Sequence, residues 1–215
     1  KLNCDKESLT DEEKKLIFND KGKVANKEVS YYYLKSKKEA STLSEEDERL
    51  LKRLSENRFT ERLVILDEEL RKAGMNRKKL CVDYPSKAKF LLEQLVKFCG
   101  KRFNGTGKHL LYINFETFTH IYLRHVEEMK MKNQFEERDK FQLKEDDVLQ
   151  VLGLVMRAVN DEYQIWKEKH PNGRFYRAGK MAYYFNGDYY CFDVEPDGRI
   201  STFYKGSGNK SKNSK

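Results

Sequence analysis

The stretch that decides the fold class is Arg174–Tyr204, which reads RFYRAGKMAYYFNGDYYCFDVEPDGRISTFY. Asn186-Gly187 near its centre is the strongest short signal for a two-residue hairpin turn, and Glu195-Pro196-Asp197-Gly198 is a second turn. The segments between these turns are rich in Tyr, Phe, Val, Ile and Thr, which favour strands. We therefore predict a meander of three antiparallel strands, over 174–185 with a bend at Gly179, 188–194 and 199–204.

Upstream of this meander, apolar residues recur at helical spacing. Residues 1–75 are predicted to be helical, with capping turns at Ser8 and Ser44, and Gly74 is a natural helix end. Further helices are expected over 85–100, from Asn114 to Val126 and from Glu145 to Trp166, with a short strand over 109–113. The charged stretch 127–144 is predicted to be a solvated helix end and loop.

Helices in one block and strands in another are typical of an α+β fold and not of an alternating α/β fold. We expect an N-terminal helical region followed by helices packed on a C-terminal antiparallel β-meander. The predicted domains are a helical accessory or delivery region (1–75), a basic α+β domain (76–205) and a disordered tail (206–215).

The positive charge is unevenly distributed. The net charge is +8; residues 1–75 hold 17 Lys/Arg and 17 Asp/Glu, whereas residues 76–215 hold 26 and 18. A basic domain beside a neutral region favours an anionic partner such as RNA, and solvated surface charge in a Lys-rich protein is the alternative. No apolar run approaches the ~20 residues of a membrane span, so none is predicted.

The four cysteines form neither a CxxC pair nor a Cys/His cluster with zinc spacing. Neither a metal site nor another cofactor is therefore predicted. Cys99 and Cys191 are expected to be buried thiols, and a Cys81–Cys99 disulfide is an open alternative.

Two of the four histidines lie close together on the helix predicted after Asn114. At about 100° per residue, His120 and Arg124 share a face, whereas His125 lies about 140° from His120. On a regular helix the two imidazoles would therefore not face one another, which argues against a shared metal. One histidine paired with Arg124 is the candidate site, and the other is structural.

Cleaving RNA without a metal needs a base for the 2′-hydroxyl, an acid for the leaving oxygen and donors for the phosphate charge. Histidine titrates near neutrality, cations hold phosphate, and tyrosine rings stack on unpaired bases. The alternative is that Tyr and Phe are present because strands favour them. The candidate catalytic residues are His120, His125, Arg177, Lys180, Thr202 and Tyr204, and the candidate RNA-binding residues are Arg124, Arg174, Tyr176, Arg199 and Lys205.

Strand periodicity places Ile200, Thr202 and Tyr204 on one face. Together, the His120–His125 helix, a further helix, Gly173–Arg177 and a meander closing on Ile200–Tyr204 resemble the barnase/EndoU/colicin/RelE-like ribonuclease superfamily, over residues 109–205. The resemblance implies helices followed by a four-stranded antiparallel sheet, and metal-independent phosphodiester transfer to a 2′,3′-cyclic phosphate.

The resemblance also implies roles for the residues. His125 or His120 would be the base or acid, Arg177 and Lys180 would hold the phosphate, and Thr202 and Tyr204 would line the site. In EndoU-like members the two histidines are expected farther apart, which argues against a two-histidine mechanism here and leaves Tyr204 or Lys180 as the acid.

Members of this superfamily are common as C-terminal toxin domains of polymorphic and contact-dependent inhibition toxins. The resemblance therefore implies a toxin delivered as a secreted effector, a cytoplasmic site of action and an acidic immunity or antitoxin protein as partner. Two alternatives stay open: a non-catalytic RNA- or protein-binding module, and an interaction or phage-defence protein without a nucleic-acid role.

Overall fold

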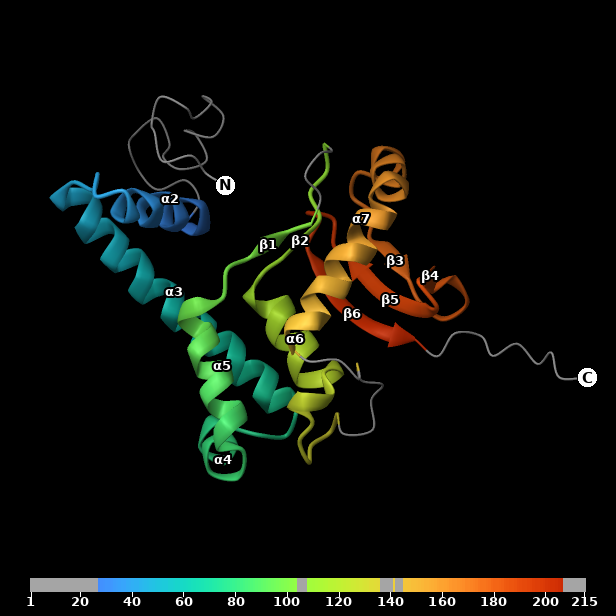
Figure 1. Cartoon of the computed structure of the whole chain (residues 1–215), viewed down its shortest axis with the longest axis horizontal. Coiled ribbons are helices and arrows are strands. Elements are labelled where there is room, and N and C mark those ends of the chain that lie inside the picture. Colours follow the sequence, from blue (N-terminus) through green and yellow to red (C-terminus); the bar gives the residue numbers. More distant parts are fainter. Residues whose placement is uncertain (1–26, 104–107, 136–140, 142–144, 207–215) are drawn as a thin grey trace, which may run out of the picture. The chain divides into compact units, whose positions relative to one another are not determined.

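The computed structural model describes residues 27–103, 108–135, 141 and 145–206 (Figure 1). These residues divide between Arg62 and Leu63 into two units, which are taken separately below. The helix predicted after Ser8 and the tail beyond Gly206 lie outside the described residues. No helix in the described ranges has the length and apolar character of a membrane span.

The first unit is a helical pair. It contains α2 (Lys27–Glu39) and the first part of α3 (Glu45–Lys72), whose first turn is acidic and last turn basic, as suits the helix dipole. Its small core consists of Tyr33, Leu34, Leu51 and Leu54. The Arg58 guanidinium lies 4.4 Å from the Tyr31 ring centroid and donates to the Tyr32 hydroxyl.

The second unit begins with the end of α3. Leu66, Leu70 and Met75 belong to its core, so the division between the units precedes the boundary at residue 75 expected from the sequence. The unit continues through α4 (Arg77–Asp83), α5 (Pro85–Lys97), β1 (Lys101–Arg102), β2 (Tyr112–Ile113), α6 (Phe115–His125), the 3-10 turn η2 (Glu127–Met129) and α7 (Glu145–Lys169).

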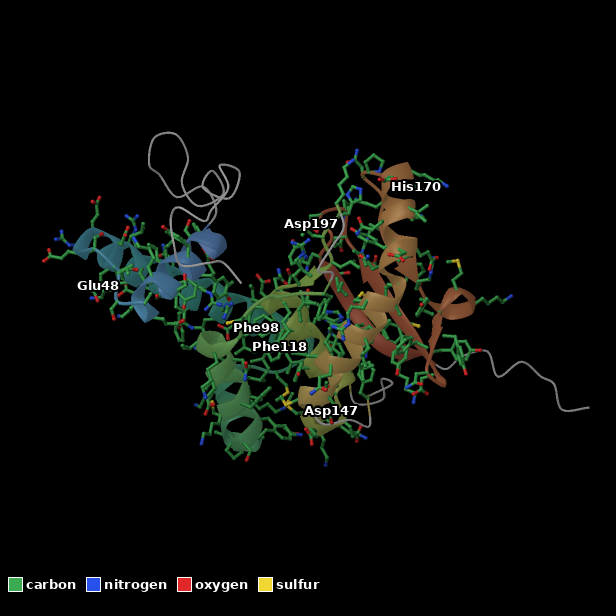
Figure 2. The ribbon with its side chains drawn as sticks, turned by 45° about the horizontal axis from the view of Figure 1, so that its top comes forward. Glu48, Phe98, Phe118, Asp147, His170 and Asp197 are labelled. Atoms are coloured by element: carbon green, nitrogen blue, oxygen red, sulfur yellow. The ribbon has the colours of Figure 1, made fainter. Side chains whose placement is uncertain are left out.

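Aromatic rings join the helices of this unit to one another. Phe98, which follows α5, and Phe118 of α6 point toward one another with ring centroids 4.6 Å apart (Figure 2). The Phe118 ring centroid in turn lies 4.2 Å from that of Tyr122. Burying such rings removes a large apolar area from water and holds α6 in one position.

The chain ends in a four-stranded antiparallel sheet, which confirms the α+β fold. Its strands are β3 (Phe175–Arg177), β4 (Tyr183–Phe185), β5 (Asp188–Val194) and β6 (Ile200–Gly206), with the 3-10 turn η3 (Gly179–Met181) after β3. β5 is central: β6 pairs along one edge, and β3 and β4 share the other. The hairpin prediction is confirmed, because Asn186 and Gly187 both have positive φ.

At Gly179, where the sequence predicts a bend, the strand is interrupted. The predicted strand 174–185 is two short strands joined by η3, with Gly179 at φ 56°. This left-handed conformation turns the chain away from β5, so β3 pairs with Phe192–Val194 and β4 with Asp188–Tyr190.

One face of the sheet belongs to the core. Phe192, Val194, Ile200 and Phe203 are each at most 1% exposed. α7 crosses this face (Figure 1). The ring centroids of Tyr163 on α7 and Phe175 on β3 lie 5.5 Å apart. The opposite face carries exposed Tyr176, Tyr184 and Tyr189.

A β-bulge in β6 makes the predicted orientation of its side chains wrong. Thr202 pairs with Asp193 and Ile200 pairs with Val194, so Ser201 is an extra residue. Asp193 and Val194 point to opposite faces, and therefore Ile200 faces the core while Thr202 and Tyr204 do not.

Two further predictions fail. The stretch 127–144 contributes Met129, Met131, Phe135 and Phe141 to the core, because apolar residues interrupt its charges. Cys99 is exposed, because α5 ends at Lys97 and Phe98 takes the inward position. Cys81 and Cys99 are both free thiols, whereas Cys191 is buried as expected.

Candidate functional site

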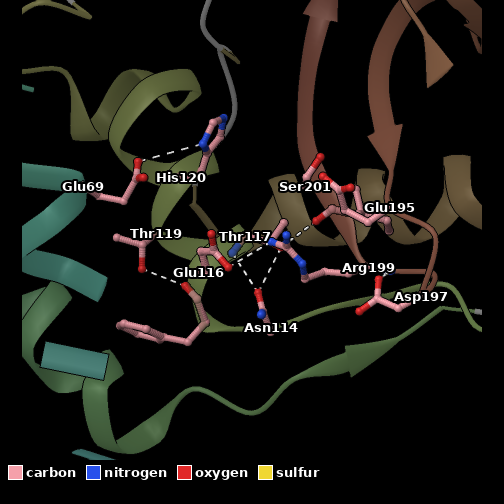
Figure 3. A network of polar contacts seen from close by, with 12 residues as sticks. Glu69, Asn114, Glu116, Thr117, Thr119, His120, Glu195, Asp197, Arg199 and Ser201 are labelled. Carbon is pink, nitrogen blue, oxygen red and sulfur yellow. Dashed lines mark hydrogen bonds and ion pairs between the residues drawn. The ribbon is translucent and has the colours of Figure 1, made fainter. Parts of the chain in front are cut away.

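Helix α6 is attached to strand β6 by polar contacts near the helix N-terminus (Figure 3). The Asn114 side chain caps α6 by accepting from the Thr117 backbone N–H at 3.0 Å, and the Thr117 hydroxyl donates to the Ile200 carbonyl at 2.5 Å. Arg199 and Glu116 form an ion pair at 3.0 Å. These contacts hold α6 beside β6, so the residues at the helix C-terminus face the later part of the strand.

Three predicted site residues meet there. The His125 ring stacks on Tyr204 of β6, with centroids 5.0 Å apart and an interplanar angle of 18°. The His120 ring centroid lies 6.0 Å from that of His125. His125 is 5% exposed, whereas the His120 side chain is 22% exposed. We call His120, His125 and Tyr204 the histidine cluster; His120 is its more accessible imidazole.

The prediction that the two imidazoles would not face one another is therefore wrong. The angle of about 140° applies to Cβ directions within a continuous helix. His125 is the last residue of α6, and its ring turns toward Tyr204, which brings it within reach of His120.

The predicted pairing of a histidine with Arg124 has a third member, Glu69 of α3. Glu69 Oε2 accepts from Arg124 at 2.9 Å. The same oxygen lies 3.9 Å from His120 Nδ1 (Figure 3). Burial raises the pKa of Glu69, but the Lys72 hydrogen bond and the charges of Arg124 and His120 outweigh it and lower that pKa. Glu69 is therefore an ionised carboxylate behind His120.

Sequence reasoning missed Glu69. It lies in an ordinary acidic run, Asp67-Glu68-Glu69, more than 50 positions before the histidines. Only the packing of α3 against α6 makes this carboxylate different from its two neighbours: Glu69 is 2% exposed. The signal that could have found it is helical spacing, because Glu69 lies three residues after Leu66 and four before Ala73, on the buried face of the helix.

The candidate cations of the sheet are held by carboxylates. Arg177 pairs with Glu162, Lys205 with Asp188 at 2.6 Å, and Arg174 with both Asp193 and Glu195. Together with the Arg199–Glu116 pair, this accounts for four of the five predicted sheet cations. Lys180 is exposed on η3, and no carboxylate of the described residues lies within ion-pair distance of it.

The structure does not bring Arg177 and Lys180 to the histidine cluster. They lie on or beside β3, and β5 separates β3 from β6, a span of about two strand spacings or 10 Å. Thr202 lies on the same face of the sheet as Tyr204. Tyr176 is 50% exposed and pairs with Asp193 of β5, which pairs with Thr202 on its other side. Arg124 joins the cluster through Glu69, which it shares with His120.

Among the described residues no group of three or more His, Cys, Asp or Glu is placed to hold a metal ion. Comparison with protein-family models, with curated proteins and with solved structures finds no match to this chain. The ribonuclease resemblance, with its toxin and immunity-protein implications, therefore stays a prediction.

Proposed function

We propose that this protein is a ribonuclease that cleaves RNA by acid–base catalysis, without a metal, at the histidine cluster. The observation that carries the proposal is the convergence of His120, His125 and Tyr204 from a helix and a strand that lie far apart in sequence. Two imidazoles and a phenol supply both a proton acceptor and proton donors.

The proposed base is His120. Glu69 faces its Nδ1, so a proton on Nδ1 is stabilised and Nε2 is left to accept the proton of the RNA 2′-hydroxyl. The 2′-oxygen then forms a bond to phosphorus as the bond from phosphorus to the 5′-oxygen breaks. Tyr204 donates a proton to the leaving 5′-oxygen, which gives a 2′,3′-cyclic phosphate and a 5′-hydroxyl.

The other members support these two groups. His125 is too buried to meet substrate, so its role is to position the Tyr204 ring by stacking. Arg124 places a positive charge beside the cluster, where negative charge develops on the phosphate oxygens.

The test is cleavage of total tRNA by the full chain in the presence of EDTA. His120→Asn and Tyr204→Phe should each lower the rate about 100-fold or more, the usual contribution of a general base or acid. The matched control is His170→Asn, because His170 is exposed and stacks on Trp166, away from α6. Cleavage that needs a divalent cation, or that survives both cluster substitutions, contradicts the proposal.

A second candidate function is RNA binding without cleavage. It is favoured by the ion pairs of Arg174, Arg177, Arg199 and Lys205, which leave few cations near the histidine cluster to hold a reacting phosphate. Under this alternative the chain binds RNA with an affinity that falls steeply as the salt concentration rises, and it produces no cyclic phosphate.

A further inference from the structure

The excess positive charge of the chain is concentrated in one short stretch of the second unit. Residues 71–102 contain 10 Lys/Arg and only two acidic residues, Asp83 and Glu93. The net charge of this stretch equals the +8 of all 215 residues, so the remainder of the chain is neutral. The stretch covers the end of α3, then α4, α5 and β1.

The fold turns these cations outward. Leu80, Ala88, Leu91 and Leu95 occupy the core-facing side of α4 and α5. The opposite sides of α4 and α5, the end of α3 and β1 carry exposed cations, and no carboxylate of the described residues lies within ion-pair distance of five of them. These five, which we call the basic surface, are Arg71, Lys78, Lys79, Lys89 and Lys101.

Only part of the stretch is neutralised by neighbouring acids. Arg77 pairs with Asp67, and Lys97 pairs with Glu93. The hydrogen bond from Lys97 is the main cause that lowers the pKa of Glu93, and the positive charges of Lys97 and Lys89 lower it further. A stretch with 10 cations and two acids thus retains a positive surplus that its own carboxylates do not cancel.

We propose that the basic surface binds the phosphate backbone of RNA, an inference that rests on the RNA-binding part of the proposed function. Most of its members are lysines, which act as point charges toward phosphate and carry little geometric selectivity. Lys78 and Lys79 lie on α4 and Lys89 lies on α5, which is about 20 Å long, the span of about six phosphates of one strand. Binding is therefore expected to be independent of base sequence.

The composition of the surface favours a nucleic-acid backbone over a lipid bilayer. Val82 and Val96 are its large exposed apolar side chains, at 71% and 62% exposed, and the apolar side of α5 is used in the core. A helix that lies in a membrane interface instead presents a broad apolar face outward. Phe98 and Phe103 are buried, so stacking on unpaired bases is not expected here either.

The test compares two triple variants of the full chain with equal net charge. Lys78→Gln/Lys79→Gln/Lys89→Gln changes the basic surface, and Lys35→Gln/Lys52→Gln/Lys169→Gln changes exposed lysines elsewhere. The probe is a short 2′-O-methyl RNA, which binds but has no free 2′-hydroxyl to react. Removing three contacts should weaken binding about 100-fold at 0.1 M salt and reduce the slope of log K against log salt by about 2. The control triple should bind as the unaltered chain does.

Several results overturn the inference: equal loss in the two triples, no loss in either, or binding of phosphatidylserine vesicles with no binding of RNA. Failure of the ribonuclease proposal gives a different pattern. In that case the probe still binds through the basic surface, while unmodified tRNA remains uncleaved.

Discussion

The basic surface and the C-terminal sheet both carry cations, yet those cations are in opposite electrostatic states. On the sheet, Arg174, Arg177 and Lys205 each lie against a carboxylate. On α4 and α5, Lys78 and Lys89 lie exposed without one among the described residues. A cation that already has a carboxylate partner gains less from a phosphate, because binding must first break or share that ion pair.

The difference follows from how each region is built. The meander brings distant residues together across strands, so Arg174, directly before β3, meets Asp193 of the neighbouring strand β5. α4 and α5 are local structures, and their sequence offers few acids for the lysines to meet. A count of charges along the sequence therefore does not show which cations have carboxylate partners, because strand register and helix packing decide that.

The largest effect is expected from breaking the sheet itself. Phe203 is 0% exposed and its ring lies 5.3 Å from Phe141 and 5.5 Å from Tyr190. Phe203→Ala should lower the free energy of unfolding by about 3–5 kcal/mol, which urea titration measures. The lysine triple on the basic surface should leave that free energy nearly unchanged while it weakens RNA binding. If the basic-surface variant unfolded at as low a urea concentration as Phe203→Ala, the lysines of that surface would contribute to stability as the core of the sheet does.

The second prediction converts paired sheet cations into unpaired ones. Glu162→Gln frees Arg177 and Asp188→Asn frees Lys205. If ion pairing keeps these cations from RNA, the double variant should bind the 2′-O-methyl probe up to about 25-fold more tightly at 0.1 M salt, about fivefold per freed charge.

The control for this gain is Asp161→Asn/Glu168→Gln, which adds the same charge at two exposed acids of α7. An equal gain in the control would show that net charge alone sets affinity. No gain in either variant would place the sheet outside the RNA-binding surface altogether.

The sequence predicts the architecture of the sheet well, because its signals are local. Asn186-Gly187 specifies its hairpin through the backbone freedom of two residues, and the strand Asp188–Val194 has the predicted bounds. The bulge at Ser201 and the break at Gly179 were not predictable in the same way, because each depends on which residues of β5 are opposite.

The candidate site is less predictable, because its members come together through packing. The histidines and Tyr204 could be named from chemistry, but the stacking of His125 on Tyr204 depends on where α6 ends. Helical spacing places Glu69 on the face of Leu66 and Leu70, but only the packing of α3 against α6 brings it to His120. The pairing of the sheet cations requires strand register, which the composition of the meander does not contain.

The third prediction concerns the attachment of α6 to the sheet, which includes a buried hydrogen bond from Thr117 to Ile200. Thr117→Val removes the hydroxyl that donates to the Ile200 carbonyl, so a buried hydrogen bond between α6 and β6 is lost. The free energy of unfolding should fall by about 1–2 kcal/mol. Thr60→Val is the control, because the exposed Thr60 hydroxyl bonds only within α3. Equal losses in both variants would show that β-branched substitution in a helix, and not the link to β6, causes the effect.

The smallest effect tests the sheet ion pairs through pH. Burial raises the pKa of Asp193, Arg174 lowers it, and Glu195 raises it again, with a net rise. The folded state therefore holds this proton more tightly than the unfolded state, so the contribution of Asp193 to stability is greatest below its unfolded pKa of about 4 and is lost as the pH rises through the folded pKa. Arg174→Gln raises the folded pKa further, so its destabilisation should be smallest near pH 3 and grow toward pH 7 in urea titrations. Adding Asp193→Asn should remove most of that growth, because Asp193 then no longer titrates. A destabilisation independent of pH would mean that Arg174 acts through packing alone, and the contrast with the unpaired lysines would lose its electrostatic basis.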